Sequence, residues 1–160
     1  MAKKAPYTIG IDQREKLPYS FECMREAAEL PYETQMQHLP TGDYVAGESG
    51  SPARQAVVER KTLADLYCTL GQHRDRFECE WERMQGYGYA ALVIEAEWLE
   101  ILNPNDHLRH DTGLLPKSVA ATLIAWSQRY GVQVWPCPGR EFAERFTFRL
   151  LERWVRDQRR

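Results

Sequence analysis

The chain has 160 residues, of which 43% are hydrophobic and 28% are charged, and its formal net charge is −2. This length suits one compact domain, and the composition excludes a disordered chain. No apolar run approaches the length of a membrane span, and the first six residues lack the apolar stretch of a signal peptide. We therefore expect a single domain over residues 1–160, with no membrane contact, in the cytoplasm.

Strand and helix patterns follow one another along the chain and predict an α/β fold. Short β-branched or apolar runs between turn residues predict strands, and apolar residues three and four apart predict helices. The continuous apolar run 90–94 is typical of a strand buried on both faces of a sheet. Strands are expected at residues 7–12, 34–39, 43–45, 56–61, 90–95 and 132–135. Helices are expected at residues 21–29, 63–70, 74–85, 117–130 and 140–160.

The most informative short pattern is Glu59-Arg60-Lys61, at the end of a predicted strand. Because strand side chains alternate between faces, Glu59 and Lys61 should share one face and Arg60 should point to the other. Asp43 begins the preceding strand, and the connecting residues 46–55 are rich in Gly, Ser and Pro, which predicts an exposed loop. A hairpin of these two strands would bring Asp43 beside Glu59.

These residue types suit phosphodiester hydrolysis assisted by a hard divalent cation. One or two carboxylates hold such a cation while it keeps several waters, and it generates hydroxide and neutralises developing charge. Asp43 and Glu59 are the candidate ligands. Lys61 can orient the attacking water, or deprotonate it if its surroundings lower its pKa. A surface ion pair between Glu59 and Lys61 would produce the same short pattern.

The extended pattern resembles the signature of the XPF family of structure-specific DNA endonucleases, in its bacterial or phage form. Asp43 after a glycine, the Glu-Arg-Lys tripeptide and Asp65 after three intervening residues match that signature. Residues 9–15 look like the family's first strand, which ends in Asp-x-Arg-Glu. Residues 73–78 are similar to its Arg-x-x-Phe-Glu stretch. The family belongs to the PD-(D/E)xK superfamily of restriction-endonuclease-like proteins.

The resemblance implies a fold, a cofactor and a set of ligands. The fold would be restriction-endonuclease-like, with a central mixed β-sheet flanked by helices on both faces. The cofactor would be Mg²⁺ or Mn²⁺, bound by Asp43, Glu59 and the backbone carbonyl of Arg60, with Asp12 as a further candidate ligand. Lys61 would position the nucleophilic water.

Other charged residues are expected to surround this site. The resemblance places Asp12 at the end of the first strand, and Arg14, Glu15, Arg60 and Asp65 in a network around the metal. For Arg14 two interpretations stay open, a bidentate phosphate contact or an internal pair with Asp12 or Asp65. For Asp65 we expect an acceptor that orients the site rather than a metal ligand.

Positive charge is concentrated in the last predicted helix, where residues 140–160 include seven arginines and four acidic residues. Several arginines recur at helical spacing, on a stripe that we take to have no acidic partners. Two interpretations stay open, a surface that follows DNA phosphates or a solvated helix face. The candidate DNA contacts are Arg145, Arg149, Arg153 and Arg156 in this helix, and Arg74 and Arg76 before it.

Two other groups of metal-ligating residue types are weaker candidates. Cysteines 23, 68, 79 and 137 lack the paired spacing of a zinc site, so we expect reduced thiols. Residues 106–111 contain two His and two Asp, in a stretch whose Asn and Pro content predicts a solvated loop.

We therefore expect a Mg²⁺- or Mn²⁺-dependent DNA endonuclease, which the resemblance implies leaves 5′ phosphate and 3′ hydroxyl ends, in DNA repair or recombination. The alternative is a catalytically silent subunit that binds or scaffolds DNA. Such partners usually lose the aspartate or the Glu-Arg-Lys tripeptide, and both are present here. The tandem helix-hairpin-helix motifs of many family members are not expected within these residues. The preferred DNA shape (branched, flap or fork) and a homodimer or partner protein stay open.

Overall fold

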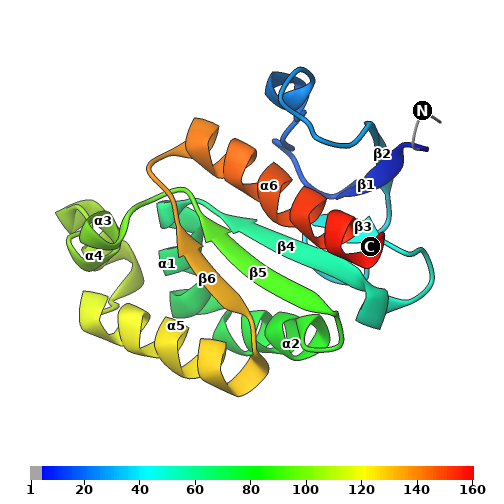
Figure 1. Ribbon diagram of the computed structural model, residues 1–160. Coiled ribbons are helices and arrows are strands. Elements are labelled where there is room, and N and C mark those ends of the chain that lie inside the picture. Colours follow the sequence, from blue (N-terminus) through cyan, green and yellow to red (C-terminus); the bar gives the residue numbers. More distant parts are fainter. Residues whose placement is uncertain (1–4) are drawn as a thin grey trace.

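The computed structural model describes residues 5–160, and its strands form one six-stranded sheet in the order β2-β1-β3-β4-β5-β6 (Figure 1). The strands are β1 (Tyr7–Asp12), β2 (Tyr32–Gln37), β3 (Tyr44–Gly47), β4 (Gln55–Lys61), β5 (Tyr89–Ile94) and β6 (Gln133–Pro136). The helices are α1 (Leu63–Gln72), α2 (Arg74–Met84), α3 (Trp98–Leu102), α4 (Asp106–Thr112), α5 (Pro116–Tyr130) and α6 (Arg140–Gln158). Two short 3₁₀ turns are η1 (Glu22–Met24) and η2 (Pro52–Arg54).

The sheet is mixed, as expected. Strand β3 runs antiparallel to β1 and β4, whereas the pairs β1–β2, β4–β5 and β5–β6 are parallel. Helix α6 covers one face, and α1, α2 and α5 cover the other (Figure 1). The predicted α/β fold with helices on both faces is confirmed.

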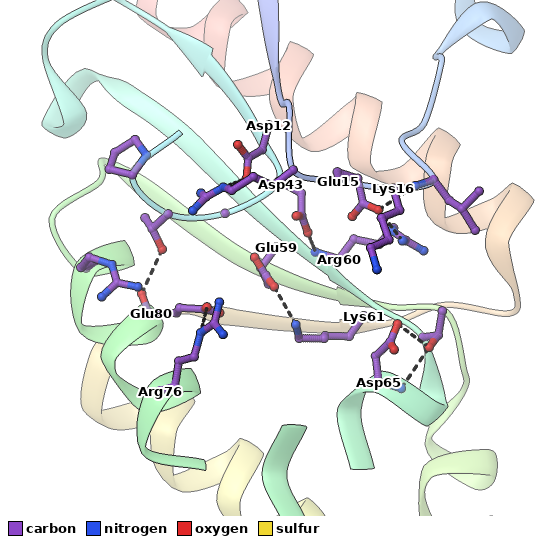
Figure 2. A pocket seen from close by; sticks show the side chains of 17 residues that line it. Asp12, Glu15, Lys16, Asp43, Glu59, Arg60, Lys61, Asp65, Arg76 and Glu80 are labelled. Atoms are coloured by element: carbon purple, nitrogen blue, oxygen red, sulfur yellow. Dashed lines mark hydrogen bonds and ion pairs between the residues drawn. The ribbon is translucent and has the colours of Figure 1, made fainter. Parts of the chain in front are cut away.

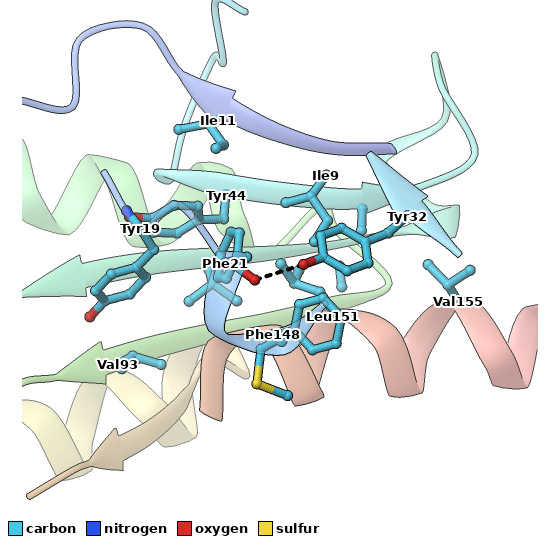
Figure 3. Close-up of a cluster of buried hydrophobic side chains, with 14 of the residues drawn as sticks. Ile9, Ile11, Tyr19, Phe21, Tyr32, Tyr44, Val93, Phe148, Leu151 and Val155 are labelled. Atoms are coloured by element: carbon cyan, nitrogen blue, oxygen red, sulfur yellow. Dashed lines mark hydrogen bonds between the residues drawn. The ribbon is translucent and has the colours of Figure 1, made fainter. Parts of the chain in front are cut away.

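Each face of the sheet has its own apolar core, because side chains alternate along the strands. Toward α6, Ile9 and Tyr44 pack with Phe148 in a cluster of buried side chains (Figure 3). On the other face, Trp81 of α2 packs edge-to-face with Trp126 of α5, with ring centroids 5.5 Å apart. No helix within residues 5–160 is both long and apolar enough to cross a membrane.

The helix expected at residues 21–29 is wrong, because only the turn η1 forms there. Phe21 adopts a left-handed conformation with φ of 59°, so the backbone is not helical at the first residue of the predicted helix. Carboxylates of α6 then satisfy the backbone of this segment. Glu144 accepts from the Phe21 amide at 2.6 Å, and Glu152 accepts from the amides of Glu29 and Leu30 at 2.6 and 3.1 Å. These distant partners replace the hydrogen bonds of a helix.

The loop expected at residues 106–111 is also wrong, because this stretch forms α4. The Asn105 side chain caps the helix by accepting from the Leu108 amide at 2.9 Å, and Gly113 ends it with φ of 65°. Asparagine and glycine therefore act here as helix caps rather than as loop residues.

Strand β2 begins and ends two residues earlier than the predicted strand 34–39. Side chains from the end of β1 explain where it stops. The Asp12 carboxylate accepts from the Leu39 amide at 3.3 Å, and Arg14 donates to the Leu39 carbonyl at 2.6 Å. The Leu39 backbone is therefore bonded to side chains instead of a neighbouring strand.

Candidate active site

The β3–β4 hairpin places Asp43 beside the end of β4, as expected from the sequence. Tyr44 pairs with Val58 in antiparallel register, and the Asp43 amide donates to the Val58 carbonyl at 2.9 Å. The Asp43 carboxylate then accepts from the Arg60 amide at 2.7 Å. Asp43 is thus tied by both its backbone and its side chain to the strand that carries Glu59.

Gly42 gives the chain the turn that leads into Asp43. Its φ is +74°, and a Cβ built on it would lie 2.4 Å from Cγ2 of Val57. A side chain here would strain the backbone and would also collide with the buried Val57 side chain.

We expect Gly42→Ala to destabilise the fold by about 1–3 kcal/mol, from the left-handed conformation and the collision together. Urea unfolding followed by fluorescence measures this change. Gly50→Ala is the matched control, because Gly50 has a similar φ of +80° but no atom within 4 Å of the built Cβ. Equal losses in both variants would show that the contact with Val57 is unimportant.

Glu59 and Lys61 share one face of β4, and Arg60 points to the other, as predicted. Lys61 Nζ lies 2.9 Å from Glu59 Oε1, and both side chains are largely buried (Figure 2). Burial raises the pKa of Glu59, which the Lys61 ammonium partly offsets. Burial alone would lower the pKa of Lys61, but the Glu59 carboxylate raises it above its ordinary value. Lys61 is therefore an ammonium group in this arrangement.

Asp43 and Glu59 bring two carboxylates into the pocket, with the Lys61 ammonium beside Glu59. Loss of solvation, followed by the nearby Glu59 carboxylate, holds the pKa of Asp43 well above its ordinary value. A divalent cation held by these carboxylates would favour their charged forms and so lower the raised pKa of Asp43. Within residues 5–160, no three His, Cys, Asp or Glu side chains form a metal-binding group. Two carboxylates and a backbone carbonyl, with waters at the other positions, still match the way proteins hold Mg²⁺.

Arg14 forms the internal pair that was one of its two interpretations. Its Nε donates to Asp12 Oδ2 at 2.8 Å, and the other Asp12 oxygen accepts from the Leu39 backbone. Both Asp12 oxygens are therefore engaged by protein groups at the edge of the pocket. Asp12 and Arg14 hold the segment that leads to Gly42 and Asp43.

Asp65 lies in the first turn of helix α1, whose N-cap is Thr62. Its carboxylate accepts from the Thr62 hydroxyl at 2.8 Å, and its amide donates to the same hydroxyl at 3.0 Å. This reciprocal arrangement is a helix N-cap motif. Asp65 lines the pocket but makes no hydrogen bond to Asp43, Glu59 or Lys61 in the structure.

Behind the pocket, on the α6 face of the sheet, lies a buried ionic network around Arg60. Arg60 donates to Glu15 Oε1 and to Glu95 Oε1, each at 3.0 Å. Glu95 Oε1 also accepts from the Tyr19 hydroxyl at 2.7 Å and from Arg140 at 3.3 Å. Of the network expected around the metal, the Glu15–Arg60 pair forms, whereas Arg14 and Asp65 bond elsewhere.

Glu95 was not among the site residues expected from the sequence. Strand β5 pairs in parallel with β4, and the Glu95 amide donates to the Lys61 carbonyl at 2.8 Å. The signal for it was an acidic residue directly after a fully apolar strand. Glu80 of α2 was also missed, although it lines the pocket and its charge acts on both Glu59 and Lys61.

The α6 arginines have acidic partners, so the prediction of a stripe without acidic partners is wrong. Three partners lie three or four residues away on the helix, and the fourth, Glu29, comes from a distant segment. The pairs are Arg145–Glu141, Arg149–Glu152, Arg153–Asp157 and Arg156–Glu29, at 2.6 to 3.0 Å.

The two arginines of α2 differ in their surroundings. Arg74 donates to the Thr122 hydroxyl at 3.1 Å and lies over the Trp126 ring, so it packs against α5. Arg76 is 81% exposed beside the pocket, with only a long 3.9 Å contact to Glu80. Arg76 is therefore the better placed of the two to meet a ligand.

One open pocket of about 470 Å³ gathers these groups at the end of the β3–β4 hairpin (Figure 2). Its acidic lining residues are Asp12, Glu15, Asp43, Glu59, Asp65 and Glu80, and its basic ones are Arg14, Lys16, Arg60, Lys61, Arg76 and Arg83. A carboxylate pair surrounded by cationic side chains suits a cation together with an anionic substrate.

The fold and this site define a mixed α/β domain with a carboxylate pair and a lysine in a polar pocket at one end of its sheet. A family model described as the ERCC4 domain matches residues 11–150. The chain belongs to this family. No curated protein matches the chain.

The solved structures that are similar to the chain include two of one protein. XPF from Aeropyrum pernix has a TM-score of 0.65 and 20% sequence identity, covering 96% of this chain and 65% of that one. The same protein in complex with DNA has a TM-score of 0.63 and 19% identity, covering 95% and 64% of the two chains. The chain thus spans just under two thirds of the length of these structures. At this identity the likeness establishes the fold.

Proposed function

We propose that the protein is a Mg²⁺- or Mn²⁺-dependent DNA endonuclease. The observation that carries the proposal is the placement of Asp43, directly before β3, and of Glu59 and Lys61, on the antiparallel strand β4, in one open pocket. Membership of the ERCC4 domain family supports nuclease chemistry. The similar XPF structure in complex with DNA supports DNA as the substrate.

In this proposal, Asp43, Glu59 and the backbone carbonyl of Arg60 hold the cation. When bound, it would activate water for attack on phosphorus and neutralise charge on the phosphate. The Asp43 carboxylate accepts from the Arg60 amide at 2.7 Å. This proposed ligand is therefore held next to the Arg60 backbone, whose carbonyl is another proposed ligand. A fixed ligand geometry is what metal-assisted hydrolysis requires from a protein.

Lys61 has the role of orienting a water or a phosphate oxygen. Its raised pKa keeps it charged, which favours orientation over proton abstraction, the other role open to it. The ammonium lies over the Phe77 ring, 5.0 Å from its centroid, and this contact limits its movement. Lys61 thus has a defined direction into the pocket.

Incubation with labelled branched, flapped, single-stranded and blunt DNA tests the function directly. With Mg²⁺ or Mn²⁺ we expect cutting that leaves 5′ phosphate and 3′ hydroxyl ends, and with a chelator we expect none. We also propose that the protein prefers branched or flapped DNA. A second copy of the chain or a partner protein would help to select this substrate. Tight binding without cutting of any substrate would instead identify a silent DNA-binding subunit.

A further inference from the structure

The buried ionic network behind the candidate active site holds the end of β4 from the α6 face of the sheet. The Arg60 guanidinium bonds to Glu15, which lies after β1, and to Glu95, which follows β5, each at 3.0 Å. All three side chains are at least nine-tenths buried. Because β1 and β5 lie on either side of the β3–β4 hairpin, the network spans the two strands that place Asp43 and Glu59.

The backbone of Arg60 turns toward Asp43. Its amide donates to the Asp43 carboxylate at 2.7 Å, on the β3 side of the strand (Figure 2). The N–H and C=O groups of one strand residue point to the same neighbouring strand, so the Arg60 carbonyl turns to this side as well. The next carbonyl, of Lys61, points to β5, where it accepts from the Glu95 amide at 2.8 Å. Movement of the Arg60 backbone would therefore displace Asp43 and the carbonyl together, which are two of the three proposed ligands.

Glu95 is itself fixed by several groups. Besides Arg60, its Oε1 accepts from the Tyr19 hydroxyl at 2.7 Å and from Arg140 at 3.3 Å. Both guanidinium groups lie over the Tyr19 ring, 5.7 Å from its centroid for Arg60 and 4.9 Å for Arg140. The Tyr19 ring stacks on that of Tyr44, the first residue of β3, at a centroid distance of 5.2 Å. Glu95 thus holds Arg60 in place although it does not line the pocket.

Stability alone is a poor explanation for this network. A buried ion pair seldom stabilises a fold more than apolar side chains of the same volume, because both charges lose their water. Within residues 5–160, Arg60 Nε is also buried without a hydrogen-bond partner, which is unfavourable. A guanidinium held by two carboxylates does have one well-defined position, and groups behind metal ligands serve to orient those ligands. The place of the network, directly behind the proposed cation site, therefore favours a positioning role.

We infer that Glu95 is a positioning residue for the divalent-cation site. Through the Arg60 side chain, it sets the place of the amide that orients Asp43 and of the carbonyl that is a proposed ligand. Glu95 contacts neither the cation nor the DNA, and it acts on how well the site is formed before the cation binds. This inference rests on the proposed nuclease function, and it adds a buried residue outside the pocket to those that determine the affinity for metal.

Calorimetric titration of Mn²⁺ into Glu95→Gln tests this role without any cutting. Glutamine keeps the size of the side chain and an oxygen acceptor, but it removes the charge that holds Arg60. We expect the affinity for Mn²⁺ to fall about three- to tenfold, at the lower end of the losses caused by changing groups behind metal ligands, because Glu95 acts through Arg60.

Glu152→Gln is the matched control. Glu152 is a buried carboxylate on the same face of the sheet, where it accepts from Arg149 at 2.7 Å and from the Glu29 amide at 2.6 Å, and it does not line the pocket. Urea unfolding should show a loss of stability in both variants. The control should nevertheless keep the wild-type affinity for Mn²⁺, because its partners do not reach the proposed ligands.

A double-mutant cycle shows whether Glu95 acts through Arg60. Arg60→Lys keeps the charge but lacks the fork that bonds to two carboxylates, so it should also weaken Mn²⁺ binding. Adding Glu95→Gln to Arg60→Lys should then weaken binding further by less than about twofold. Losses that multiply fully in the double variant would overturn the route through Arg60.

The positioning role and the cation site can fail separately. Wild-type affinity in Glu95→Gln, or an equal loss of affinity in Glu152→Gln, would overturn the positioning role and leave the cation site in place. Absence of Mn²⁺ binding by the wild-type protein would refute the cation site itself, and the positioning role with it.

Discussion

Glu59→Gln is expected to reduce DNA cutting by at least about 100-fold, while leaving the fold and DNA binding in place. The substitution keeps the size of the side chain but removes one of the two carboxylates that would hold the cation. Glutamine keeps an oxygen that can accept from Lys61, which lies 2.9 Å from Glu59, and it relieves the repulsion that raises the pKa of Asp43, so we expect no large loss of stability. Single-turnover cleavage with saturating enzyme measures the loss of rate.

Glu80→Gln is a useful comparison for this variant. Glu80 lines the same pocket and carries the same charge, but it lies on α2 and is not one of the proposed ligands. We expect it to lose far less activity than Glu59→Gln. Similar losses in the two variants would mean that the total charge of the pocket matters, and not ligation by Glu59.

Glu95→Ala is expected to destabilise the protein by about 3–5 kcal/mol, because it breaks a buried ionic network. One Glu95 oxygen accepts from Arg60, Tyr19 and Arg140, so three groups would lose a partner. Arg60 already has a buried Nε without a partner, which leaves little scope for compensation. Urea unfolding, with a check that the m-value is unchanged, gives the free energy of unfolding.

Two controls accompany this prediction. Glu95→Gln keeps an oxygen acceptor, so it should lose less stability than Glu95→Ala. Glu82→Ala removes an exposed glutamate of α2 and should change the free energy by less than about 0.5 kcal/mol. A loss below 1 kcal/mol in Glu95→Ala would contradict the role given to the network.

The parts of the site that follow from strand geometry were predictable. The alternation of side chains placed Glu59 and Lys61 together and Arg60 opposite, and the turn-rich residues 46–55 indicated the hairpin that brings Asp43 to them. These features depend on local periodicity and turn chemistry, which a single sequence records directly.

The parts that depend on distant side chains were not predictable in the same way. Glu144 and Glu152 of α6 accept from the amides of Phe21 and Glu29, at the two ends of the helix expected over residues 21–29. Glu29 pairs with Arg156, on a stripe that was expected to have no acidic partners. Glu95 joins Arg60 only because β5 lies beside β4 in parallel register. Sequence spacing does not record such tertiary contacts.

The central claim is that Asp43 and Glu59 form a divalent-cation site, and calorimetric titration of Mn²⁺ into the purified protein tests it most directly. We predict saturable binding by wild type that is at least about tenfold weaker in Glu59→Gln, because one of the two carboxylate ligands is gone. Absence of Mn²⁺ binding by wild type, or equal affinity in Glu59→Gln, would contradict the claim.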